Sequence, residues 1–196
     1  MGRLIWALLA LLILANCGTR YSSPPRNLDD ACSIISQRPS YLKAFRATER
    51  KWNVPVHVQM ATIHAESRFD GDARTPFRYA LGVIPMGRQS SAYGYSQALD
   101  GTWDDYRAAT GRRSAKRDRI EDATDFMGWY FNESRKRNGI ALDDARNQYL
   151  AYHEGHSGYR RGSYNSKSWL LRVASGVDTR ASLYQSQLAT CRRARR

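Results

Sequence analysis

The stretch Thr62-Ile63-His64-Ala65-Glu66-Ser67-Arg68-Phe69 places an ionisable carboxylate, Glu66, at the end of a run of small and apolar residues. Apolar side chains recur at steps of three and four residues from Pro55 onward, and this periodicity predicts a helix with a buried face. Glu66 stands beside that face. Burial disfavours the charged form of a carboxyl group and raises its pKa, which suits an acid that protonates a leaving oxygen near neutral pH. Taken alone, the stretch also fits a helix-end glutamate that is solvated or paired with Arg68.

The chain around this stretch has a mainly helical pattern. Ser40 is a suitable N-cap for a helix that Asn53 ends, and Asp118 with Glu121 can form a capping box for a long helix that Gly139 closes. Glycines and prolines between residues 70 and 91 predict a loop with a small β-hairpin. Further helices are expected over residues 100–109, 143–153 and 167–188.

Length and composition indicate one folded domain. The 196 residues, of which 42% are hydrophobic and 25% charged, suffice for one core but not for two independent ones. The net charge of +13 predicts an anionic partner. Charge alone would allow nucleic acid, but a secreted protein meets anionic lipid or cell-wall polymer instead.

The first residues favour secretion. Residues 1–16 carry one early cation, Arg3, before an apolar run that is shorter than the roughly 20 residues a membrane-spanning helix needs, so we expect a signal peptide. Cys17 directly after Leu-Ala-Asn resembles a bacterial lipobox, which implies a lipidated mature N-terminus and a tether over residues 17–38. An ordinary signal peptide with an incidental cysteine is the alternative.

The other two cysteines fit the same compartment. With Cys17 lipidated, Cys32 and Cys191 remain, and in an oxidising periplasm they can form a disulfide between the two ends of the body; two unpaired buried thiols are the alternative. No Cys or His partner stands at ligand spacing, so we expect no metal site. Gly18, rather than Asp, after the lipidated cysteine indicates a periplasm-facing lipoprotein of the outer membrane, by resemblance to those of Gram-negative cells.

Two further stretches complete a pattern that begins at Glu66. The order Glu66-Ser67-x-Phe69, Ala92-x-Gly94-x-x-Gln97 and Ala151-Tyr152-x-x-Gly155 resembles the three signature motifs of the soluble lytic transglycosylase family, relatives of goose-type lysozyme. The resemblance covers residues 40–188. It implies a mainly α, lysozyme-like domain over residues 39–191, with residues 192–196 as a solvated basic tail.

The resemblance also implies an activity, namely cleavage of the MurNAc–GlcNAc β-1,4 bond of peptidoglycan. The glutamate of the first motif is the sole catalytic carboxylate of that family, which implies that Glu66 is first the acid and then the base. The product is a 1,6-anhydro sugar, and no metal or organic cofactor takes part. The expected partners are glycan strands and, through the lipid, the membrane, but not nucleic acid. Residues expected to contact the substrate are Ser67, Tyr95, Gln97, Tyr152 and His153.

This chain departs from the family pattern in three places. Tyr95-Ser96 stands where the family usually has Leu-Met, His153 stands where it has Asn, and residues 70–89 are a longer spacer that we interpret as a flap over the cleft. The departures leave a catalytically inactive peptidoglycan-binding lipoprotein as one alternative. A lysozyme-type hydrolase is another, in which a second carboxylate activates water; Asp70, Asp72 and Glu154 are the candidates.

Overall fold

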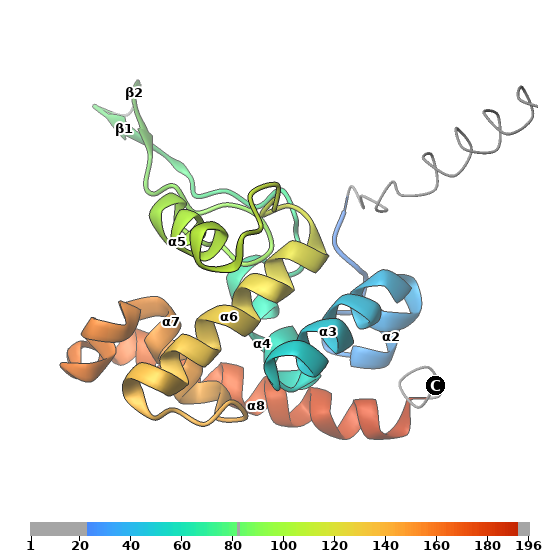
Figure 1. Ribbon diagram of the computed structural model, residues 1–196. Coiled ribbons are helices and arrows are strands. Elements are labelled where there is room, and N and C mark those ends of the chain that lie inside the picture. Colours follow the sequence, from blue (N-terminus) through green and yellow to red (C-terminus); the bar gives the residue numbers. More distant parts are fainter. Residues whose placement is uncertain (1–22, 82, 192–196) are drawn as a thin grey trace, which may run out of the picture.

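The helix that carries Glu66, α4 (Val56–Ser67), is largely buried between other helices. The computed structural model describes residues 23–81 and 83–191, and α4 contacts α3, α6, α7 and α8 within it (Figure 1). The helix was expected to begin at Pro55, but Pro55 has an extended backbone and is the N-cap residue, so the first helical residue is Val56. The glutamate therefore belongs to the central helix of the domain.

The fold is mainly α with one two-stranded antiparallel sheet, which confirms the predicted fold class. Asn53 and Gly139 end α3 and α6 in the left-handed conformation, as predicted. The elements are α2 (Ala31–Gln37), α3 (Pro39–Trp52), α4 (Val56–Ser67), β1 (Phe77–Ala80), β2 (Ile84–Arg88), α5 (Asp100–Thr110), α6 (Ile120–Asn138), α7 (Ala145–Arg160), the 3-10 helix η1 (Ser163–Ser166) and α8 (Ser168–Thr190).

Helix starts differ from the expected ones. The N-cap residue of α3 is Arg38 rather than Ser40, since Pro39 takes the first position, and that of α6 is Arg119 rather than Asp118. A further helix, α2, lies within the segment that we assigned to the tether. The Asp30 side chain caps it by accepting hydrogen bonds from two backbone amides, and its apolar residues are buried. The packed body thus begins before residue 39.

A disulfide joins the two ends of this body. Cys32 in α2 and Cys191 after α8 are bonded, with their Cα atoms 5.6 Å apart and 159 positions apart in sequence. The signal peptide (1–16), Cys17 and the basic tail (192–196) lie outside the described residues. Within the part of the chain that is described, the helices are too short or too polar to cross a membrane.

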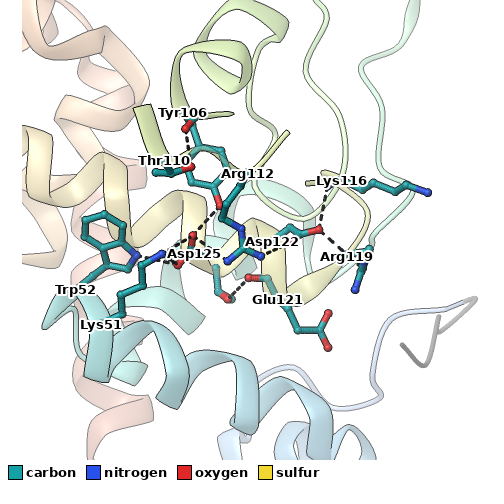
Figure 2. A network of polar contacts seen from close by, with 11 residues as sticks. Lys51, Trp52, Tyr106, Thr110, Arg112, Lys116, Arg119, Glu121, Asp122 and Asp125 are labelled. Atoms are coloured by element: carbon teal, nitrogen blue, oxygen red, sulfur yellow. Dashed lines mark hydrogen bonds and ion pairs between the residues drawn. The ribbon is translucent and has the colours of Figure 1, made fainter. Parts of the chain in front are cut away.

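A polar network ties α3 and α5 to α6 (Figure 2). Asp125 of α6 accepts hydrogen bonds from Lys51 (2.8 Å), Trp52 (2.9 Å) and Tyr106 (2.7 Å). Burial raises the pKa of Asp125, but these donors outweigh it and hold the pKa below its usual value. Arg112 adds an ion pair at 3.3 Å. Helix α5, which precedes Arg112, is thereby fixed beside the helix that supports the site described next.

The segment expected to be a flap is the hairpin of β1 and β2. It projects away from the helices (Figure 1), and its side chains are almost all exposed. Its base is nevertheless anchored, because the backbone of Arg74 forms a bridge with Tyr93.

Candidate active site

Glu66 lies in the last turn of α4, where the chain changes direction sharply. Arg68 and Phe69 follow it with φ values of 53° and 63°, a left-handed conformation that is unfavourable for bulky residues. The Phe69 ring is buried and stacks on Tyr41 with 6.0 Å between centroids. This packing offsets the backbone cost and fixes the end of the helix, and hence the position of the Glu66 carboxyl group.

The surroundings of Glu66 change its acidity. Burial raises the pKa of this carboxyl group to about 7, although a hydrogen bond from the Tyr149 hydroxyl favours the charged form and lowers the pKa in part. The residue keeps some contact with solvent. Near neutral pH both protonation states are therefore populated, so the same group can give a proton and take one back.

The first motif is bonded to the middle motif. The Ser67 hydroxyl donates to the Tyr95 carbonyl oxygen at 2.8 Å and is itself buried. Tyr95 is 3% exposed, and its hydroxyl is bonded to that of Tyr41 at 2.9 Å. The prediction that the Tyr95 side chain contacts substrate is therefore corrected: this ring belongs to the core. The predicted substrate contact of Ser67 is corrected for the same reason, since its buried hydroxyl instead bonds α4 to the loop of the middle motif.

The middle motif is a tight loop that needs its glycine. Gly94 has φ 77°, and a Cβ atom there would lie 2.2 Å from the Arg117 carbonyl oxygen. Gln97 follows in the left-handed conformation, and its side-chain amide donates to the carbonyl oxygens of Ala73 (3.0 Å) and Gly94 (2.8 Å). The half-buried Gln97 side chain thus stabilises the loop through these two hydrogen bonds to its backbone.

The last motif and the residues of α7 just before it contribute two tyrosines to the site, of which we predicted one. The Tyr152 hydroxyl donates to the Ser96 carbonyl oxygen at 2.5 Å, so it joins the last motif to the middle one. Burial, and then the charge of Glu66, hold the pKa of Tyr152 well above its usual value. The residue that hydrogen-bonds Glu66 is instead Tyr149. Its position one turn earlier puts it on the same face of α7 as Tyr152, which is the signal that could have identified it.

Helix α7 is interrupted just after these tyrosines. Gly155 has φ 72° and ψ 158°, which breaks the helical geometry and is accessible almost only to glycine. Before the break, His153 is exposed, with its Nδ1 atom 3.1 Å from Glu154 and its ring 5.1 Å from that of Trp169. The substitution of histidine for the usual asparagine thus lies at the surface.

Glu154 is an unsuitable proton donor. Burial raises the pKa of its carboxyl group, but hydrogen bonds from Lys167, Ser163 and His153 outweigh it and lower the pKa to about 2. The Lys167 ammonium lies 2.7 Å from the carboxylate, whose side chain is 4% exposed. Glu154 is therefore a structural carboxylate that fixes η1 against the kinked part of α7.

A cavity opens where the middle and last motifs meet. It has a volume of about 250 Å³ and includes Gln97, Tyr152 and His153 in its lining. A second hollow of about 740 Å³ shares Tyr130 and Gly155 with it and continues between α5, α6 and α7. Together they form a concave surface beside the middle and last motifs, lined by residues of α5, α6 and α7.

The described residues contain no group of His, Cys, Asp and Glu side chains arranged to hold a metal ion.

Comparison with known proteins identifies the family of the chain. A family model described as the transglycosylase SLT domain matches residues 5–191. A search of curated proteins gives no match.

Proposed function

The chain belongs to the transglycosylase SLT domain family, and we propose that it is a lytic transglycosylase that cleaves the MurNAc–GlcNAc β-1,4 bond of peptidoglycan and forms 1,6-anhydroMurNAc. The observation that carries this proposal is the raised pKa of the Glu66 carboxyl group and its position among the motifs. Its pKa is raised to about 7 by burial, at a helix end that Ser67 bonds to the middle motif, and its charge acts on Tyr152 of the last motif.

The first step is protonation of the leaving group. Glu66 in its neutral form donates its proton to the glycosidic oxygen as the C1–O bond breaks, and the N-acetyl group of the MurNAc residue stabilises the positive charge at C1. The raised pKa makes the donor available near neutral pH.

The second step uses the same group in reverse. The Glu66 carboxylate removes the proton of the MurNAc C6 hydroxyl, whose oxygen then bonds to C1 and closes the anhydro ring. Glu66 is again protonated and no water is consumed, in contrast to the two-carboxylate scheme of most glycosidases.

Other side chains hold the reacting groups in place. We assign Tyr149 to the orientation of the Glu66 carboxyl group, since its hydroxyl hydrogen-bonds it. We also assign Gln97 and His153, which line the 250 Å³ cavity, to contacts with substrate amides and hydroxyls. Tyr152 acts through Ser96 by holding the middle loop.

A hydrolytic alternative would need a second carboxylate that activates water. Glu154 is paired and strongly acidic, and an Asp72 carboxylate oxygen accepts a hydrogen bond from Tyr93 at 3.1 Å. Asp70, the third candidate, accepts a hydrogen bond from the Asp72 backbone amide at 2.9 Å. Since all three carboxylates are engaged in hydrogen bonds, we favour the non-hydrolytic route.

Digestion of purified sacculi, with mass analysis of the released muropeptides, tests the proposal. Anhydro products that disappear in Glu66→Gln support it, and reducing ends would mean hydrolysis. A protein that binds sacculi without releasing fragments would be the inactive binding protein. The matched control is Glu121→Gln, an exposed glutamate of α6, which should leave the product pattern unchanged.

We further propose that the protein is a periplasm-facing lipoprotein of the outer membrane, anchored through Cys17. Mass measurement of the mature N-terminus and membrane fractionation of Cys17→Ser test this. A variant that stays in the membrane fraction would refute lipidation as the sole anchor.

A further inference from the structure

Most of the large apolar side chains that are exposed among the described residues lie on the β1–β2 hairpin. The exposed fraction reaches 92% at Leu81 and 76% at Val83, on either side of the turn. The other members of the group are Phe77, Tyr79, Ile84 and Met86.

This exposure is unfavourable in water. A two-stranded hairpin without a covered face is marginally stable by itself, and contiguous exposed apolar side chains usually mark a surface that binds something. The residues of β2 are exposed throughout and those of β1 almost so, which leaves both faces of the hairpin unpacked. The hairpin also projects from the helices (Figure 1), so it can be covered from both sides only by a medium or partner that surrounds it.

The charge of the hairpin indicates the kind of partner. Three exposed arginines, Arg74, Arg78 and Arg88, lie on or next to it, and no acidic residue occurs between positions 73 and 99. A surface that is apolar and purely cationic is complementary to one that is apolar and anionic. A membrane containing anionic lipid has these properties.

The order of residue types along the hairpin supports the same partner. Aliphatic Leu81 and Val83 are at the tip, and Tyr79 and then Arg78 follow nearer the body. Arg88 is at the base, with its guanidinium group 4.4 Å from the centre of the Phe77 ring. Aliphatic, aromatic and cationic side chains follow in this order from the acyl chains to the phosphates of a lipid interface. Aliphatic side chains at the tip do not suit a sugar ligand, which stacks on aromatic rings.

We propose that this hairpin inserts its tip into the boundary between headgroups and acyl chains of an anionic membrane, with its arginines on the lipid phosphates. The base of the hairpin is bonded to the middle motif, since Gln97 donates to the Ala73 carbonyl oxygen at 3.0 Å. An arm of about six residues spans roughly 20 Å at about 3.3 Å per residue. An inserted hairpin therefore holds its own base, and the middle motif bonded to that base, at about this distance from its tip in the membrane. Insertion depends neither on cleavage by Glu66 nor on lipidation of Cys17.

Labelling at defined positions tests insertion in the full chain. An environment-sensitive fluorophore is attached to Leu81→Cys or, as a control, to Leu183→Cys on α8, which is also exposed. Both variants carry Cys17→Ser, so that the label reacts with the introduced thiol while the disulfide stays intact. Lipids with brominated acyl chains should quench the label at position 81, but not the label at 183, in vesicles of phosphatidylethanolamine and phosphatidylglycerol.

Substitutions provide the second measurement. Leu81→Ser combined with Val83→Ser should weaken binding to these vesicles by roughly tenfold or more, since one buried aliphatic side chain supplies about that factor. Arg78→Gln should weaken it roughly fivefold. The matched controls Leu183→Ser and Arg172→Gln, both at exposed positions of α8, should change it little.

Two results would overturn the proposal. One is a label at Leu81 that stays in water when vesicles are added, or that is quenched no more than the label at Leu183. The other is a label at Leu81 that responds to sacculi or to a protein partner but not to vesicles. Neither result bears on cleavage, because muropeptide release is measured separately.

Discussion

Replacement of Glu66 by glutamine should abolish cleavage and at the same time stabilise the protein above neutral pH. Burial raises the pKa of Glu66 from its ordinary value of 4.5 to about 7, so the folded state opposes ionisation of this group. Since the folded-state pKa lies above that of the unfolded chain, the energetic penalty is absent below about pH 4.5 and grows as pH rises to about 7, where it levels off.

The size of this energetic penalty follows from the size of the pKa shift of Glu66. One pKa unit corresponds to about 1.4 kcal/mol, and with allowance for the partial solvent contact of Glu66 the penalty is about 2–3 kcal/mol. The neutral amide of glutamine carries no such penalty, and its oxygen can still accept a hydrogen bond from Tyr149. Glu66→Gln should therefore be more stable than the wild type by this amount at pH 8 and equally stable at pH 4.

Urea unfolding of both proteins at several pH values, with the disulfide intact, measures this difference. Loss of the general acid should lower muropeptide release by at least about 100-fold in the same preparation. Glu121→Gln, at an exposed position, should change stability by no more than about 0.5 kcal/mol at any pH. Equal stability of wild type and Glu66→Gln from pH 4 to pH 8 would refute the reasoning, because Glu66 would then be solvated rather than buried.

Three more predictions concern neighbouring features. Tyr149→Phe removes a hydrogen bond that favours the carboxylate, so the alkaline limb of the pH–rate profile should move to higher pH; Tyr159→Phe, on the same helix, should leave it in place, and a downward shift for Tyr149→Phe would contradict the assignment. Gly94→Ala places a Cβ atom against a backbone carbonyl and should cost about 2 kcal/mol or more in urea unfolding, whereas Gly101→Ala meets open space and should be tolerated. Reduction of the disulfide between α2 and α8 should lower the free energy of unfolding by about 2–5 kcal/mol, and an unchanged urea midpoint in reductant would show that the bond contributes little.

The sequence alone determined the local features of this protein. The three- and four-residue apolar spacing, the helix-ending positions of Asn53 and Gly139 and the glycine-rich segment before the middle motif depend on residues close together in the chain, so their outcome could be read from the chain itself. The family could also be predicted from the sequence alone, because each of the three motifs is short and the motifs follow one another in the expected order. The sequence predicted Glu66 as the acid, and burial in the structure gives a physical cause for the pKa this role requires.

The tertiary structure decided which distant groups meet. That Tyr149 rather than Tyr152 hydrogen-bonds Glu66, and that Tyr95 is buried against Tyr41, depends on how α3, α4 and α7 pack together. Side-chain hydrogen bonds to the backbone of a remote loop leave no periodic trace in the sequence, and neither does burial that arises from helix packing. For the same reason the sequence predicted a hairpin after Glu66, but only the three-dimensional arrangement revealed that its apolar side chains face solvent.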